Sequence, residues 1–121
     1  METKRQLRVA RLLQRDLAQI FQLESRNVFG GAMITVTKVN VTKDLATAKV
    51  FLSLFGMKDK QVLTKKIKQR TKDIRRKLGY NIKNQLRVVP ELKFFEDDSL
   101  DYIENIERLL ADDEKYDNDQ K

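Results

Sequence analysis

Apolar residues recur at helical spacing near the start of the chain and at alternating spacing further along. Residues 4–24 carry one apolar stripe, which predicts an amphipathic helix: Val9, Leu13, Leu17, Ile20 and Phe21. After Gly30-Gly31, residues 33–42 are rich in β-branched side chains, which predicts a strand. Residues 46–55 alternate strictly and predict a second strand. Because only Lys43-Asp44-Leu45 separates the two strands, they are expected to pair as a hairpin.

The second predicted strand has two unlike faces. One face is apolar throughout and consists of Ala46, Ala48, Val50, Leu52 and Leu54. The opposite face carries Lys49, Phe51 and Phe55. Such a half-polar face is one that water or a ligand could meet.

Residues 59–84 predict further helix, because apolar residues again follow steps of three and four: Leu63, Ile67, Ile74, Leu78 and Ile82. Thr71 occupies the missing rung of that stripe. Two alternatives stay open here. The helix runs straight through, which propensity slightly favours, or it bends near Thr71. Gly79 marks a further bend or an early end.

The chain's only proline, Pro90, disfavours helix at the residue before it, so the second helical region ends earlier. Residues 92–95 predict a third strand that has Pro90 at its start. Asp98-Ser99 then offers an N-cap for a short helix carrying Tyr102, Ile103, Ile106, Leu109 and Leu110. Residues 111–121 are acidic and nearly without apolar side chains, which is typical of a disordered tail.

The order α-β-β-α-α-β with a short C-terminal helix predicts an α+β fold. We expect a three-stranded mixed sheet with the helices on one face, as in KH-like domains of type II. Residues 1–110 would form one KH-like RNA-binding domain and residues 111–121 an acidic disordered tail. The core is expected to include Val50, Leu52, Leu63, Ile67, Leu92 and Phe94.

Charge is sorted along the chain rather than mixed. Residues 57–90 hold 12 Lys or Arg and 2 Asp, whereas residues 91–121 hold 4 Lys or Arg and 12 Asp or Glu. At 100° per residue, six cations lie opposite the apolar stripe of residues 59–84: Lys65, Lys68, Lys72, Arg75, Arg76 and Lys83. Like charges four residues apart on a helix each cost a few tenths of a kcal/mol of helix stability, so solubility alone explains these cations poorly. Phosphate binding explains them better.

Composition limits the chemistry available. The chain has no His and no Cys, which removes the commonest general base, thiol nucleophiles and thiolate metal sites. Asp97, Asp98, Asp101 and Glu104 are better explained by helix capping than by a metal. We therefore expect no catalytic residues, no metal and no cofactor. The start of the chain lacks an apolar leader and no apolar run approaches 18 residues, so we expect a cytoplasmic protein and no membrane partner.

Common nucleotide- and RNA-binding motifs are missing. Gly30-Gly31 is not followed by Lys-Ser or Lys-Thr, so there is no P-loop. The predicted strands lack the paired aromatic residues of an RNA-recognition motif, and no Gly-x-x-Gly clamp of a KH domain occurs.

Several segments together resemble the ribosome-binding factor A family. They are Arg8-Val9, Lys43-Asp44-Leu45-Ala46, Ala48-Lys49-Val50, Ile74-Arg75, and above all the stretch from Leu86 to Ser99 with Pro90 and Phe94-Phe95. The resemblance covers about residues 4–110. It implies a bacterial assembly factor that binds the free small (30S) ribosomal subunit and its 16S rRNA, assists late rRNA maturation without catalysis, and is linked to growth in the cold.

The chain departs from this family at one point. The family usually replaces the Gly-x-x-Gly clamp with an Ala-x-Gly kink between two helices, and this chain has Arg70-Thr71-Lys72 there. Two cations in place of small residues favour side-chain contact with phosphate. The candidate RNA-binding residues are Arg8, Arg11, Lys43, Lys65, Lys68, Arg70, Lys72, Arg75, Arg76, Lys83 and Arg87.

The expected partners are the small subunit and its rRNA, with small-subunit ribosomal proteins as a further candidate, and the protein is expected to act as a monomer. Three alternatives remain at this point. A general nucleic-acid-binding KH-like module would lack ribosome preference. An RNA-directed enzyme would use Lys and the carboxylates of residues 97–104. A membrane-surface protein would need an apolar helix face that the core does not use.

Overall fold

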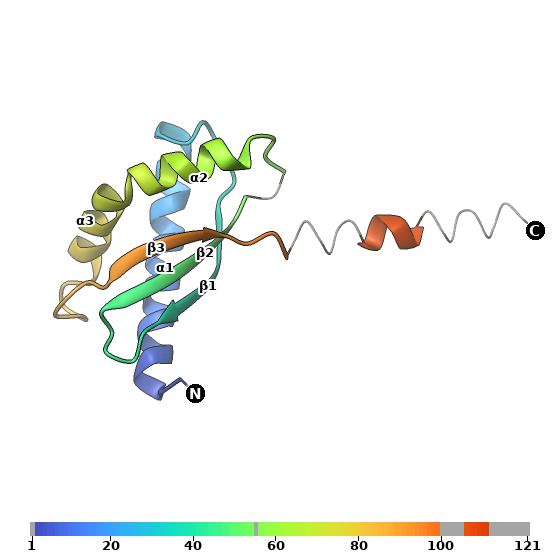
Figure 1. The fold of residues 1–121 in the computed structure, drawn as a ribbon. Helices are drawn as coiled ribbons and strands as arrows, with labels where there is room; N and C mark the ends of the chain where they lie inside the picture. The colour runs from blue at the N-terminus through green and yellow to red at the C-terminus, as the bar shows by residue number, and fades with distance from the viewer. Residues whose placement is uncertain (1, 55, 100–105, 112–121) are drawn as a thin grey trace, which may run out of the picture.

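The computed structural model describes residues 2–54, 56–99 and 106–111. The elements follow one another as α1 (Lys4–Asn27), β1 (Thr35–Val41), β2 (Thr47–Ser53), α2 (Lys60–Gln69), α3 (Thr71–Ile82) and β3 (Glu91–Glu96) (Figure 1). Residues 106–111 are helical as well. The remainder of the predicted C-terminal helix, residue 55 and residues 112–121 of the acidic tail lie outside the described residues. The predicted α-β-β-α-α-β order is confirmed.

The three strands form one mixed sheet in the order β1-β2-β3. β1 and β2 pair antiparallel as the predicted hairpin, with Val39 opposite Val50. Their register shifts between Val36 and Lys38, so Thr37 forms a β-bulge. β3 returns parallel to β2 after the two helices and sets Val50 opposite Phe94. The mixed three-stranded sheet predicted from the sequence is therefore present.

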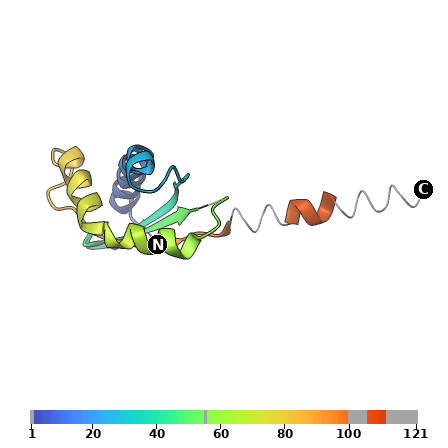
Figure 2. The ribbon, with the colours of Figure 1, turned by 90° about the horizontal axis from the view of Figure 1, so that it is seen from above.

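All three long helices lie on the same side of the sheet or along its β3 edge (Figures 1 and 2). α1 crosses behind the sheet in Figure 1, and no helix among the described residues covers the opposite face of the sheet. The edge of the Phe21 ring of α1 meets the Phe94 ring of β3 at 5.8 Å between centroids and 84° between planes. The core residues expected from the sequence are all buried: Val50, Leu52, Leu63, Ile67, Leu92 and Phe94.

Two reciprocal hydrogen bonds between Thr3 and Gln6 hold the first turn of α1. The Thr3 hydroxyl accepts a hydrogen bond from the Gln6 backbone N–H at 3.1 Å, and the Gln6 side chain accepts one from the Thr3 N–H at 2.8 Å. This capping box satisfies two helix-terminal donors. The buried Gln6 amide also donates to the Val41 carbonyl at 2.8 Å. The N-terminal half of α1 is thereby held beside the hairpin end of β1.

The helical region of residues 59–84 is interrupted, so the straight alternative is wrong. Arg70 leaves the helical conformation, with φ −101° and ψ 12°, between the last residue of α2 and the first of α3. The Thr71 hydroxyl donates to the Lys68 carbonyl at 2.8 Å, a local bond that competes with regular helix. The apolar rows on the two sides of the break have different partners. α2 packs on β3, whereas α3 packs mainly on α1. A straight helix could not serve both.

α3 continues past Gly79 to Ile82, so the alternative that this glycine ends the helix is wrong. A Cβ atom at this position would lie 3.1 Å from Cγ2 of Val89. The glycine therefore allows the chain that leads into β3 to approach α3 closely.

Candidate nucleic-acid interface

The solvent side of α2 and α3 carries exposed cations, as the sequence predicted. Helical geometry sets them opposite the buried rows that include Ile67 and Leu78. We refer to this set as the helical cationic surface: Lys65, Lys68, Arg70, Lys72, Arg76 and Lys83. The Lys83 ammonium also lies 5.0 Å from the centre of the exposed Tyr80 ring. Because the helix breaks at Arg70, these cations follow two helix axes rather than one straight ridge.

Four other predicted contacts gather at the hairpin end of the sheet instead. Lys43 lies in the hairpin turn and Arg87 in the segment before β3. A backbone hydrogen bond from Glu91 N–H to the Ala46 carbonyl at 2.8 Å joins those two segments. Arg8 and Arg11 project from the solvent side of the N-terminal half of α1, which is held at this same end. All four side chains are exposed, but they form a group separate from α2.

A single carboxylate on α3 is shared by several cations. Asp73 Oδ1 lies 2.7 Å from Nη2 of Arg76, and Asp73 Oδ2 lies 3.1 Å from Nζ of Lys77 and 3.8 Å from Nη1 of Arg70. Hydrogen bonds from Arg76 and then Lys77 lower the pKa of Asp73. One negative charge thus orients several positive side chains without cancelling them, and the surface stays cationic.

Arg75 has a structural task that its sequence position does not reveal. Its Nε donates to the Pro90 carbonyl at 3.1 Å and its Nη2 donates to the Val89 carbonyl at 2.6 Å. These bonds hold the start of β3 against α3. A guanidinium has five N–H donors, so Arg75 keeps donors for an anion. The sequence predicts Arg75 only as a phosphate contact, and the structure adds a second role, which is to hold the backbone before β3.

Beside Arg75 the surface is hollowed. A depression of about 340 Å³ is lined by Lys72, Arg75, Arg76, Gly79 and Val89. Three of these side chains are cationic, and Gly79 contributes no side chain to fill the space. Such a shallow cationic hollow suits a phosphate group better than an apolar ligand.

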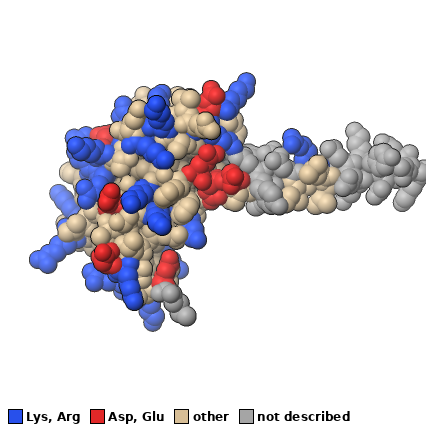
Figure 3. All heavy atoms as spheres, in the orientation of Figure 1, with Lys and Arg blue, Asp and Glu red and all other residues tan. Residues whose placement is uncertain are grey.

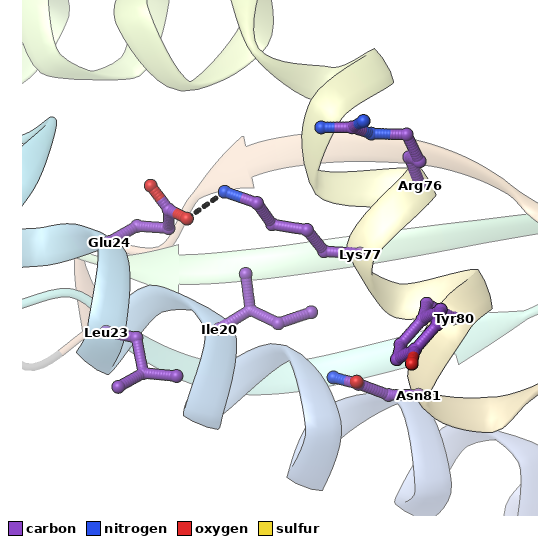
Figure 4. A pocket seen from close by; sticks show the side chains of 7 residues that line it. All are labelled: Ile20, Leu23, Glu24, Arg76, Lys77, Tyr80 and Asn81. Atoms are coloured by element: carbon purple, nitrogen blue, oxygen red, sulfur yellow. Dashed lines mark hydrogen bonds and ion pairs between the residues drawn. The ribbon is translucent and has the colours of Figure 1, made fainter.

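Lys77 joins α3 to α1. Figure 4 shows its ammonium pointing at the Glu24 carboxylate, with which it forms a hydrogen-bonded ion pair. The Glu24 carboxylate and then Asp73 raise the pKa of Lys77. The pair stands at the head of a groove of about 550 Å³ between the two helices, whose lining includes Ile20, Leu23 and Tyr80. This lysine orients α3 and is not part of the helical cationic surface.

The uncovered face of the sheet holds a second group of exposed side chains. Figure 3 shows Lys and Arg spread over this side of the molecule, with an acidic cluster where the chain leaves β3. In the strand register, Lys38, Phe51 and Phe95 form one row and Asn40, Lys49 and Lys93 the next. The two phenylalanine rings stack at 5.5 Å and 27°. The sequence-based expectation concerned the aromatic signature of an RNA-recognition motif, and it did not include this cross-strand pair.

The acidic end of this face is ordered by the bulge. The Thr37 hydroxyl donates to Asp97 Oδ2 at 2.6 Å, and the Ser99 N–H donates to Asp97 Oδ1 at 3.0 Å. These bonds, and the nearby charge of Lys38, lower the pKa of Asp97. Asp97 thus links the bulge to the segment that follows β3, and the helix for which an N-cap is expected at Asp98-Ser99 has its first turn outside the described residues. Asp101 and Glu104, for which a capping role is expected, lie outside the described residues.

Two absences concern the alternatives raised from the sequence. In the ranges 2–54, 56–99 and 106–111, no three acidic, His or Cys side chains come together in a way that could hold a metal ion. Over the same ranges, no helix combines the length and the apolar character that crossing a bilayer requires.

Comparison with known proteins identifies relatives over nearly the whole chain. The family model of ribosome-binding factor A matches residues 5–110. Ribosome-binding factor A of Cytophaga hutchinsonii is 41% identical over 111 residues, which are 92% of this chain and 84% of that protein. The Flavobacterium johnsoniae protein of the same name is 45% identical over 112 residues, which are 92% of this chain and 86% of that protein.

Solved structures show the same fold. The crystal structure of ribosome-binding factor A from Thermus thermophilus superposes with a TM-score of 0.62 at 22% identity, over 75% of this chain and 94% of that one. A homology model of the Thermus thermophilus factor, fitted into the cryo-EM map of a complex with the 30S subunit, gives a TM-score of 0.57 at 22% identity, over 72% of this chain and 89% of that one. The match to the family model and the sequence identity to curated relatives place this chain in the ribosome-binding factor A family.

Proposed function

We propose that this protein binds the free small ribosomal subunit through 16S rRNA and assists late rRNA maturation without catalysis. The observation that carries the proposal is the helical cationic surface in a chain of this family. A relative with the same fold has been fitted into a 30S complex, which supports the same partner here. The protein would act as a monomer in the cytoplasm, where ribosomal subunits assemble.

The proposed mechanism is occupancy of a site on immature rRNA. Lys65 and Lys68, before the helix break, and Lys72, after it, would contact phosphates, and the hollow beside Arg75 would receive a further phosphate. Phosphate contacts position a protein but carry little sequence information, so selectivity would come from the shape of the immature RNA. The factor would hold one RNA conformation until maturation is complete and would then leave.

Sedimentation of a cell lysate on a sucrose gradient at low salt tests the partner. We expect the protein to migrate with free small subunits. Migration only at the top of the gradient would reject the proposal. Equal competition by unrelated RNA and by DNA would instead favour a general nucleic-acid-binding module.

A charge-removal variant tests the surface. Replacing Lys65, Lys68 and Lys72 with Gln should weaken binding to small subunits and lower the slope of log affinity against log salt by about 2 to 3. The matched control replaces Lys4, Arg5 and Arg26 with Gln, which removes the same charge from exposed positions on α1. Arg75 is left intact in both variants because it holds β3. Equal loss in both variants would show that only net charge matters.

A further inference from the structure

The uncovered sheet face carries two features that a purely structural surface does not need. Lys49 and Lys93 are direct cross-strand partners in the parallel β2–β3 register. Like charges opposite each other destabilise a sheet. Among the residues that the structure describes, neither lysine lies within ion-pair distance of an acid. A bound anion would remove this repulsion.

Exposed aromatic surface adjoins these lysines. Phe51 and Phe95 occupy the next pair along the same two strands, and Phe95 is 40% exposed. Side chains two residues apart on a strand share a face and stand roughly 6.6 Å apart along it. Two rings and two ammonium groups therefore lie within reach of one short ligand. Lys38, beside Phe51 on β1, adds a third cation at the edge of the rings.

This combination of chemistry matches one class of ligand. Single-stranded nucleic acids are bound by aromatic rings on which bases stack, together with cations that follow the backbone. A duplex hides the faces of its bases, and a free phosphate has no use for the rings. Glu91 and Asp97 lie at opposite ends of the face and would limit the ligand to the middle of the sheet.

We propose that the uncovered sheet face is a second RNA site, which takes a short single-stranded segment by stacking a base on the Phe51–Phe95 pair while Lys38, Lys49 and Lys93 contact its phosphates. The site is distinct from the helical cationic surface. This inference rests on the proposed function in one respect, which is that the partner is RNA. The protein would then hold a helical or folded part of the RNA with one surface and an unpaired stretch with another.

Binding of hexauridine RNA to the full chain, followed by fluorescence anisotropy at low salt, tests this site. We expect the unmodified chain to bind it, and to bind a base-free oligomer of the same length and charge about tenfold more weakly, because stacking is lost. Replacing Phe51 and Phe95 with Leu should weaken hexauridine binding to the level of the base-free oligomer. Equal affinity for the two oligomers, or no effect of the two Leu substitutions, would overturn the proposal.

Two further variants separate binding from folding. Tyr80→Leu removes an exposed ring from α3 and should leave hexauridine affinity within about twofold, since it lies off the sheet face. Lys93→Glu places an acid opposite Lys49. It should keep or raise the urea midpoint of unfolding while weakening hexauridine binding at least tenfold. A Lys93→Glu chain that binds as tightly as the unmodified one would also overturn the proposal.

Outcomes for the two proposals can be told apart. Loss of subunit sedimentation with intact hexauridine binding rejects the ribosomal partner and leaves the sheet site. Subunit binding that persists while hexauridine fails to bind at low salt rejects the sheet site. Nuclear Overhauser contacts between the Phe95 ring and the chain's own C-terminal residues would likewise overturn it, because the occupant would then be internal.

Discussion

The helical cationic surface and the open sheet face differ in how their positive charges are supported. On the helical cationic surface, Arg70 and Arg76 contact the Asp73 carboxylate, and the neighbouring Arg75 is bonded to backbone carbonyls. On the sheet, Lys49 faces Lys93 directly, with aromatic rings beside them. The first arrangement keeps cations in place on a folded scaffold. The second leaves two cations repelling each other beside aromatic rings on which a base can stack.

This difference shows which observations point to a ligand. A cation with an acidic partner has already gained part of its interaction energy within the chain, and so its presence on a surface is weak evidence for binding. A pair of like charges on adjacent strands gains no such interaction energy within the chain, so its presence is stronger evidence for a ligand. The helical surface is therefore supported mainly by family membership, whereas the sheet surface is supported mainly by its own geometry.

The largest expected effect separates the two faces of β3. Phe94→Ala should lower the free energy of unfolding by about 3 to 5 kcal/mol, because Phe94 is buried against Phe21. Phe95→Ala should cost about 1 kcal/mol or less, since its ring is partly exposed and loses only the cross-strand pair. Urea denaturation measures both. Similar costs for the two variants would contradict the assignment of Phe95 to an open face.

The next effect distinguishes a positioning cation from a surface cation on α3. Arg75→Gln should lower the free energy of unfolding by about 1 to 2 kcal/mol, because the Val89 and Pro90 carbonyls lose a charged donor. Lys72→Gln, one turn earlier and exposed, should change it by less than about 0.5 kcal/mol. Amide hydrogen exchange gives a second reading: the first residues of β3 should exchange faster only in the Arg75 variant.

The smallest expected effect concerns pH at the bulge. The pKa of Asp97 is lower in the folded chain than the usual value of about 3.9, so this carboxylate stabilises the fold at pH values above 3.9. That contribution is lost as the pH falls through the lowered pKa. Asp97→Asn should therefore be less stable than the unmodified chain at pH 7, and the difference should shrink below about pH 4.

Urea denaturation at several pH values checks this expectation. Asp98→Asn is the matched control, because it removes the same charge from the neighbouring exposed residue and leaves the Thr37 hydrogen bond in place. A stability difference for Asp97→Asn that does not vary with pH would argue against the proposed cause.

The sequence predicted most helices and strands because the spacing of apolar residues within each element reflects which of its side chains are buried. The stripe of α1 and the alternation of β2 each record which side chains are buried, and the observed bounds differ from the expected ones by only a few residues. The break at Arg70 could not be predicted in this way. The rows on α2 and α3 stay in phase through Thr71, so periodicity carries no sign that α2 and α3 contact different partners.

Long-range pairing explains what was missed in the candidate sites. Phe51 and Phe95 are adjacent only because β3 returns parallel to β2 in one particular register, and no local pattern encodes that register. The bonds from Arg75 to Val89 and Pro90 likewise span 14 and 15 residues. Sequence reasoning placed Arg75 among surface cations because helical position alone does not show what the rest of the chain brings alongside.

The parallel return of β3 also sets the order in which the protein becomes functional during synthesis. β3 is the last strand of the sheet, and it supplies Phe95, Lys93 and the carbonyls that hold Arg75. The lysine pair on the sheet cannot form before Lys93 has been added, nor the aromatic pair before Phe95. A nascent chain that already displays the α2 cations would thus still lack the complete sheet face. Affinity for single-stranded RNA would be acquired only after β3 has been synthesised.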